Sequence, residues 1–148
     1  MKKKVITLLM SLVLASGSIG NVQVLAADTT EQETEAAETE EEFVWDGPVL
    51  NAYLGTITGP SGKETYYNLP MGGVISIMRN EGFSEEEYPY WERDDGCKML
   101  GDYIMVAADL SIRPRGSLID CSLGKAIVCD TGEFIYSNPM QLDIAVNW

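Results

Sequence analysis

The sequence predicts a small all-β domain built as a compact barrel or sandwich. The prediction rests on short apolar runs at residues 49–54, 73–78, 103–108, 117–121, 126–129 and 142–148. These runs are rich in strand-forming residues, are too short for typical helices, and are separated by turn-forming residues. About one hundred residues follow position 42, which is enough for one domain with one modest core.

The first 42 residues differ from this domain in composition. Three lysines at positions 2–4, an apolar run over residues 5–15 and small residues near position 27 predict a secretory signal peptide over residues 1–27. As a helix, that apolar run would reach about 17 Å, against about 30 Å for a hydrocarbon core, so we expect no stable membrane anchor. Residues 28–42 are mostly acidic and predict a disordered linker. The domain at residues 43–148 is therefore expected to be secreted, extracellular or associated with the cell wall.

Within the domain, turn signals predict where the strands are interrupted. Glycine and proline at residues 55–62 and 69–73 predict two exposed loops, and Leu123 with Gly124 suits a two-residue hairpin turn. The run at residues 73–78 fits either a strand or the start of a helix. Ser84, followed by three glutamates, has the pattern of a helix N-cap, so we expect at most one short helix here.

Three aromatic residues at positions 88–91 lie in an acidic segment, at residues 85–95. Aromatic faces stack on sugar rings, which favours a glycan-binding groove. A loop that folds back on its own aromatic residues explains the same pattern, and the sequence leaves both interpretations open.

Composition excludes several kinds of chemistry. The chain contains no histidine, which removes Ser-His and Cys-His nucleophile pairs and helical zinc motifs. Its net charge of −13 disfavours nucleic-acid binding, which depends on cationic residues. Cys97, Cys121 and Cys129 are expected to be buried free thiols, not zinc ligands, although a disulfide from Cys97 stays open. We predict no metal and no cofactor, which leaves carboxylates as the leading catalytic candidates.

Three aspartates lie at the ends of apolar runs, at Asp109, Asp130 and Asp143. Together with Pro114, Gly116 and the sequence Asp130-Thr131-Gly132, their order resembles the "3D" domain, named for its three aspartates. That domain occurs in secreted bacterial cell-wall proteins and in the C-terminal part of the MltA-type lytic transglycosylases. The resemblance covers residues 104–146, and Ala52 with Tyr53 gives a weaker match to the first strand of such domains.

The resemblance implies a six-stranded double-psi β-barrel that acts on peptidoglycan glycan strands. Asp143 matches the family's catalytic acid, which protonates the glycosidic oxygen and then assists attack by the sugar's own 6-hydroxyl, giving a 1,6-anhydro product. Asp130 would lie beside it and Asp109 at the rim, while Thr131, Gly132 and Tyr53 would contact the substrate. An aspartate in this role needs a pKa well above its usual range, which apolar neighbours and a second carboxylate favour.

Three alternatives stay open at this point. Two of the aspartates could hold a water for direct hydrolysis. The aspartates could instead be turn-forming residues of a non-catalytic peptidoglycan-binding or interaction domain, because aspartate is common at strand ends. The run at residues 127–132 also looks like the catalytic turn of aspartic proteases, but that mechanism needs two such turns and therefore a homodimer of this chain. The sequence does not predict the oligomeric state.

Overall fold

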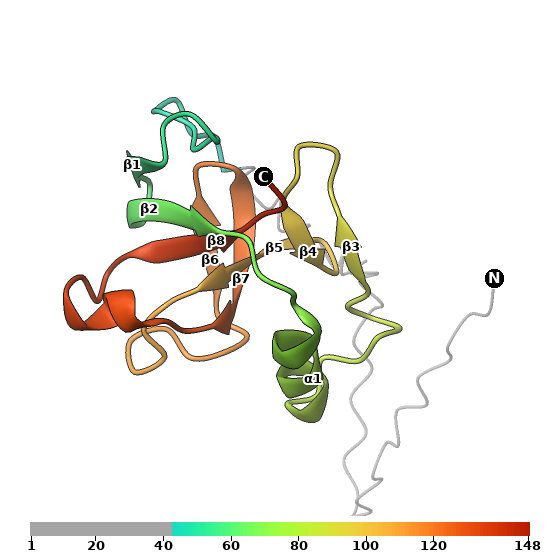
Figure 1. Ribbon diagram of the computed structural model, residues 1–148. Coiled ribbons are helices and arrows are strands. Elements are labelled where there is room, and N and C mark those ends of the chain that lie inside the picture. The colour runs from blue at the N-terminus through green and yellow to red at the C-terminus, as the bar shows by residue number, and fades with distance from the viewer. Residues whose placement is uncertain (1–42) are drawn as a thin grey trace, which may run out of the picture. The chain divides into compact units, whose positions relative to one another are not determined.

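The computed structural model describes residues 43–148, which form one mixed sheet of eight strands with one α-helix and one short 3-10 helix (Figure 1). The strands are β1 (Thr56–Gly59), β2 (Gly62–Tyr67), β3 (Tyr90–Glu92), β4 (Lys98–Leu100), β5 (Tyr103–Ala107), β6 (Leu118–Cys121), β7 (Gly124–Asp130) and β8 (Leu142–Ala145). The helices are α1 (Gly72–Asn80) and η1 (Glu133–Tyr136). The prediction of a mainly β fold is confirmed. The predicted signal peptide and acidic linker lie outside the described residues.

The sheet is organised around β5, which has neighbours on both of its edges. Strand β7 runs parallel to it on one edge, while β4 and β8 share the other edge and are both antiparallel to it. Strand β8 in turn pairs in parallel with β2, and β1 completes that side of the sheet. Two parallel pairs, β2–β8 and β5–β7, are thus joined by the antiparallel contact between β5 and β8. The antiparallel hairpins β3–β4 and β6–β7 extend the sheet.

Side chains connect β6 to the hairpin formed by β1 and β2, although no strand pairing between them is found in residues 43–148. Ser61 Oγ donates a hydrogen bond to the carbonyl of Asp120 at 2.6 Å. Ser122 donates to both oxygens of Glu64, from its backbone nitrogen at 2.9 Å and from its hydroxyl at 2.6 Å. Glu64 is fully buried, so these bonds satisfy a carboxyl group inside the protein.

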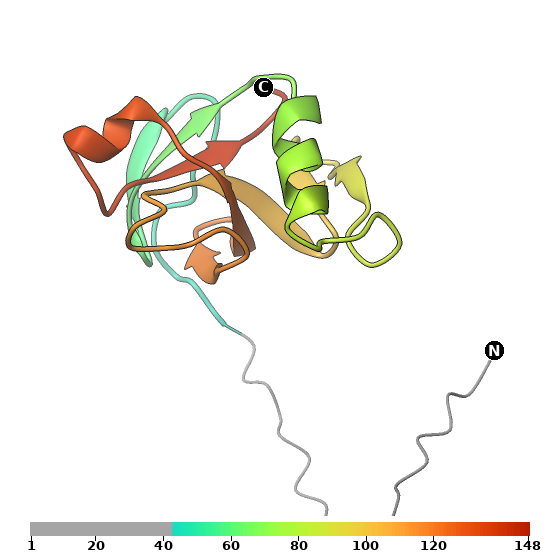
Figure 2. The same cartoon turned by 90° about the horizontal axis from the view of Figure 1, so that it is seen from below.

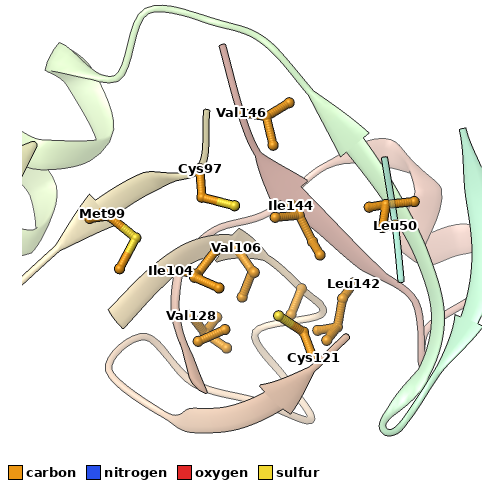
Figure 3. Close-up of a cluster of buried hydrophobic side chains, with 12 residues drawn as sticks. Leu50, Cys97, Met99, Ile104, Val106, Cys121, Val128, Leu142, Ile144 and Val146 are labelled. Atoms are coloured by element: carbon orange, nitrogen blue, oxygen red, sulfur yellow. The ribbon is translucent and has the colours of Figure 1, made fainter. Parts of the chain in front are cut away.

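Two hydrophobic clusters lie on opposite faces of the strands, because successive strand residues alternate between faces. Figure 3 shows the inner cluster, whose labelled side chains point toward one another between the strands: Leu50, Cys97, Met99, Ile104, Val106, Cys121, Val128, Leu142, Ile144 and Val146. Helix α1 lies outside the strands (Figure 2). It contributes Met71, next to its first turn, and Met78 to the outer cluster, whose strand members include Met105, Ile127 and Ala145. Alternation along β5 thus places Ile104 and Val106 inside and Met105 outside.

The structure corrects two predictions in the N-terminal part of the domain. Residues 49–54 form no strand but end in a turn at residues 52–54, because the Asn51 side chain accepts hydrogen bonds from the backbone nitrogens of Tyr53 and Leu54. The predicted loop at residues 55–62 contains β1 and the tight turn into β2. Gly62 begins β2 with a φ of 129°, a backbone conformation that favours glycine.

Other local predictions have mixed outcomes. Residues 73–78 lie in helix α1, whereas Ser84 caps only one isolated turn, by accepting a hydrogen bond from the Glu87 backbone nitrogen at 3.2 Å. The β6–β7 hairpin turns at residues 122–123, one position earlier than predicted, since Cys121 pairs with Gly124. All three cysteines are buried free thiols, as expected.

The aromatic segment at residues 88–91 is used inside the domain. Tyr88 packs edge-on against Phe83 with ring centroids 5.1 Å apart, and Trp91 Nε1 donates to the carbonyl of Gly101 at 2.8 Å. Tyr90 and Trp91 belong to β3, so part of the segment predicted to be irregular is a strand. These contacts favour the second interpretation of this segment, a chain folded back on its own aromatic residues.

Candidate functional site

Four residues from four adjacent strands form one row across the sheet. Thr65 of β2 pairs with Asp143 of β8, Asp143 pairs with Ala107 of β5, and Ala107 pairs with Asp130 of β7. Paired residues of neighbouring strands project to the same face. The two aspartates therefore lie on one face, on either side of the small side chain of Ala107, with Cα atoms two strand spacings apart, or about 9 to 10 Å.

A β-bulge places Asp130 in this row. The pairing of β5 with β7 changes register between Val106, which faces Val128, and Ala107, which faces Asp130. Cys129 is the additional residue. In a regular strand without the bulge, Asp130 would lie two positions after Val128 and project, like Val128, toward the inner cluster. The bulge thus turns a carboxyl group from the core side of the sheet to the side that carries Asp143.

Asp143 is partly buried and is held by a short hydrogen-bond chain. Thr65 Oγ1 donates to Asp143 Oδ1 at 2.6 Å, and Gln141 Nε2 donates to the same Thr65 oxygen at 2.9 Å. Burial raises the pKa of the Asp143 carboxyl, and the negative charge of Asp130 raises that pKa further, whereas the hydrogen bond from Thr65 opposes the rise. The environment of Asp143 therefore keeps its carboxyl group protonated to a higher pH than is usual for an aspartate.

Tyr67 connects β2 to the second aspartate. Its hydroxyl donates to Asp130 Oδ2 at 3.4 Å, a long hydrogen bond. Because β8 and β5 lie between β2 and β7 in the sheet, this hydrogen bond joins two strands that do not pair with each other. Burial raises the pKa of the Tyr67 phenol well above its usual range, and the charges of Asp130 and Asp143 raise that pKa as well. The phenol is neutral at ordinary pH and therefore remains a hydrogen-bond donor to Asp130.

Asp109 follows β5 and has a different environment. Its Oδ1 accepts hydrogen bonds from the backbone nitrogen of Ser111 at 2.9 Å and from the Ser111 hydroxyl at 2.7 Å. Its carbonyl also accepts from the nitrogens of Ile112 and Arg113, so the residue closes a turn. The Ser111 hydrogen bonds hold the pKa of the Asp109 carboxyl below its usual range. Within residues 43–148, its side chain makes no hydrogen bond to Asp130 or Asp143.

The three residues predicted to contact substrate lie in exposed or partly exposed places. Thr131 is exposed directly after Asp130, and Gly132 precedes η1 with its backbone extended. Tyr53 is 99% exposed in the turn capped by Asn51, and none of its contacts joins it to the carboxyl pair. Thr131 and Gly132 are thus adjacent to the site in sequence, whereas the place of Tyr53 in the site stays a prediction.

Sequence reasoning missed Thr65, Tyr67 and Gln141. The only signal was the alternation of Thr65 and Tyr67 along a strand, because no motif marks the three residues. They become recognisable once the parallel pairing of β2 with β8 is known.

Other groups in the domain offer little alternative chemistry. Burial raises the pKa of each cysteine thiol to about 12, which keeps the thiols neutral. Among residues 43–148, the ion pairs are Arg93–Asp95, Arg115–Glu81 and Lys125–Asp120, so no cation pairs with Asp130 or Asp143 there. The same residues contain no cluster of three or more potential metal ligands, and none of their helices is long and apolar enough to cross a membrane.

Comparison with known proteins adds no assignment, because no family model, curated protein or solved structure matches the chain. The case for a function therefore rests on the carboxyl pair and its surroundings.

Proposed function

We propose that this chain is a secreted cell-wall protein that cleaves peptidoglycan glycan strands in the manner of a lytic transglycosylase. The observation that carries the proposal is the environment of Asp143. This carboxyl group is partly buried, has a raised pKa and shares one face of the sheet with Asp130. A carboxyl group whose pKa is raised and that lies beside a second carboxyl group suits general acid catalysis at a glycosidic oxygen.

In the proposed reaction, Asp143 acts first as an acid and then as a base. Its proton moves to the glycosidic oxygen while the bond from that oxygen to C1 of the sugar breaks. The Asp143 carboxylate then takes the proton of the sugar's own 6-hydroxyl as that oxygen bonds to C1. The products are a 1,6-anhydro sugar and a shortened glycan strand, and Asp143 has its proton back. The step needs no water, no cofactor and no second nucleophile.

Asp130 and Tyr67 would assist this step by electrostatics. The negative charge of Asp130 keeps the pKa of Asp143 high, and it also stabilises the positive charge that develops at C1 as the bond breaks. The neutral Tyr67 phenol holds Asp130 in place from β2. Ala107, which pairs with both aspartates, has a small side chain that does not itself separate the two carboxyl groups.

We also propose that the strands close into a six-stranded double-psi barrel formed by β1, β2 and β5–β8. Two features support this proposal: the two parallel pairs joined through β5 and β8, and the hydrogen bonds from Ser61 and Ser122 that link β6 to the β1–β2 hairpin. The hairpin β3–β4 and helix α1 would be additions to that barrel. They fall in the part of the chain that the resemblance to 3D domains leaves uncovered.

The test is incubation of residues 43–148 with purified peptidoglycan, followed by mass analysis of the released fragments. The proposal expects fragments with 1,6-anhydro ends. Asp143→Asn keeps the shape of the side chain but cannot deliver a proton, so release should fall by roughly a hundredfold to ten-thousandfold. Asp102→Asn, at an exposed turn between β4 and β5, is the matched control and should cleave like the wild type. Fragments with reducing ends would indicate hydrolysis through a water held by the two aspartates.

A second candidate function is a non-catalytic domain that binds peptidoglycan. The observation that favours it concerns Asp109. Its side chain accepts hydrogen bonds from Ser111 and thereby stabilises a turn, which is a structural role and not a catalytic one. Wild-type protein that binds peptidoglycan but releases no soluble fragment would decide for this function. Asp143→Asn would then change only the stability of the domain.

A further inference from the structure

Gln141 is a buried amide beside the site that the proposed reaction does not use. Only 6% of the residue is exposed, and it directly precedes β8, which carries Asp143. Its Nε2 donates to Thr65 Oγ1 at 2.9 Å, and Thr65 Oγ1 donates to Asp143 Oδ1 at 2.6 Å. A polar amide is costly to bury, so this chain of two hydrogen bonds calls for an explanation.

The direction of these hydrogen bonds follows from what each group can donate. The Thr65 hydroxyl has one proton and accepts at its lone pairs. Within residues 43–148, Asp143 Oδ1 is the only acceptor that this proton reaches. If the amide were reversed, Gln141 Oε1 would take the Thr65 proton and the partly buried Asp143 oxygen would lose its donor. Only the arrangement with Nε2 toward Thr65 satisfies both groups.

The backbone around Gln141 is held from two sides. Its nitrogen donates to the carbonyl of Asn138 at 3.0 Å. Arg113 donates to the carbonyl of Met140 at 3.2 Å and to the carbonyl of Ser61 at 3.0 Å, which ties this segment to the turn before β2. The amide is therefore presented to Thr65 by a fixed backbone.

We propose that Gln141 is a positioning residue that acts through the Thr65 hydroxyl, keeping that hydroxyl directed at Asp143 Oδ1 so that Oδ2 carries the transferable proton. The inference rests on the proposed function for its catalytic meaning. A carboxyl oxygen that already accepts a strong hydrogen bond is the poorer site for a proton, so the acid proton resides on the other oxygen. The glycosidic oxygen would then approach Asp143 from the Oδ2 side.

The same hydrogen bond serves the second half of the reaction. A donor to a carboxylate stabilises the charged form, which is why Thr65 opposes the rise in the pKa of Asp143. Once the proton has left, Asp143 is a carboxylate in a partly buried place, and the Thr65 hydroxyl stabilises it until the 6-hydroxyl proton arrives. Gln141 keeps this donor oriented in both states.

The first test measures the pKa of Asp143 by NMR titration, which requires no catalysis. Thr65→Val removes the donor and should raise the pKa of Asp143, whereas Thr65→Ser keeps the hydroxyl and should leave it close to the wild-type value. Gln141→Leu frees the hydroxyl to rotate and should raise the pKa by a smaller amount. In the double variant, Gln141→Leu should add nothing to Thr65→Val, because Gln141 acts only through Thr65. Asn147→Leu, which removes a remote amide bonded to Glu92, is the control.

The second test measures glycan cleavage as a function of pH. Gln141→Leu should lower kcat by about threefold to tenfold and move the pH profile upward with the pKa of Asp143. A merely structural role would lower stability without moving the profile. An unchanged Asp143 pKa in Gln141→Leu, or a change of equal size in the Thr65→Val background, overturns the inference. Wild-type protein that cleaves nothing, but shows the pKa coupling, overturns the proposed function and leaves the hydrogen-bond relay intact.

Discussion

The buried carboxyl group of Glu64 offers the sharpest prediction about stability. Ser122 gives Glu64 both of its hydrogen bonds, and the Ser122 hydroxyl also accepts from the backbone nitrogen of Leu50 at 3.1 Å. Ser122→Ala deletes the hydroxyl, so the Glu64 carboxyl group loses one donor and the Leu50 backbone nitrogen loses its acceptor. It should weaken the connection between the β6–β7 turn, β2 and the segment that carries Leu50 into the core.

The size of this effect follows from the two hydrogen bonds lost. A hydrogen bond to a charged group contributes about 1.5 to 3 kcal/mol, and an unsatisfied buried donor costs about 1 to 3 kcal/mol. Because the two share one atom they will not add fully, and we expect the free energy of unfolding to fall by about 2 to 5 kcal/mol. That is a large fraction of the about 5 to 15 kcal/mol that typically stabilises a domain.

Urea unfolding followed by far-UV circular dichroism measures this loss. The urea midpoint should fall by roughly 1 to 3 M, with an unchanged slope. Ser137→Ala removes an exposed hydroxyl bonded to the carbonyl of Phe134 at 3.0 Å, and it should change the free energy by less than about 0.5 kcal/mol. Burial raises the pKa of Glu64, so the Ser122→Ala loss should be larger at alkaline pH, where the carboxylate is charged, than at acid pH. Equal midpoints for the two serine variants at alkaline pH would refute the reasoning.

Three further predictions concern the site and its support. Tyr67→Phe removes the donor to Asp130 and should lower glycan cleavage by about twofold to tenfold while changing stability by less than about 1 kcal/mol; unchanged kcat would remove Tyr67 from the mechanism. Burial raises the folded-state pKa of Asp143 above the ordinary aspartate value of 3.8, so the stabilising contribution of this group is fully present below pH 3.8 and is lost as pH rises through the raised pKa. Asp143→Asn should therefore gain stability relative to the wild type as pH rises, which thermal unfolding at acid and neutral pH checks. Gly59→Ala would place a methyl group against the Glu64 carboxyl and should destabilise by about 1 to 3 kcal/mol, whereas Gly73→Ala, which meets no atom, should not.

The strands that sequence predicts best are those buried on both faces. Strands β5, β7 and β8 are covered by the inner cluster on one side and largely by the outer cluster on the other. Such strands need apolar residues at nearly every position, so they appear in the sequence as continuous apolar runs. The runs at residues 103–108, 126–129 and 142–148 fall on them for this reason.

Strands β1 and β2 were not predicted from the sequence, because their stability comes from residues that are distant in the chain. Residues 56–67 include threonine, lysine and glutamate and form no apolar run. The one fully buried residue of β2 is Glu64, an ionisable residue that the sequence pattern would place at the surface. Its place in the core depends on Ser122, which lies 58 positions away in the chain. The opposite error, at residues 49–54, has a local cause, since the Asn51 side chain forms a turn with an otherwise strand-like run.

The carboxyl pair itself was predicted from a resemblance in motif order, but the reason it forms is visible only in the structure. Strand alternation alone would direct Asp130 to the same face as Val128, toward the core. The extra residue at Cys129 moves Asp130 opposite Ala107, and the antiparallel register of β5 with β8 places Asp143 opposite the same alanine. A register shift of one residue has no signature in a single sequence.

Asp109 and Asp143 show why identical residues at similar strand ends acquire different chemistry. Asp109 lies in a turn whose hydroxyl and backbone donors stabilise its charged form, so its pKa is lowered and it keeps its charge. Asp143 has one donor, a partly buried position and a neighbouring negative charge, so its pKa is raised. Proton donation near neutral pH requires the second environment. Of these two aspartates, only Asp143 combines that environment with a second carboxylate across Ala107, which is why the proposed chemistry is assigned to β8 and not to the turn after β5.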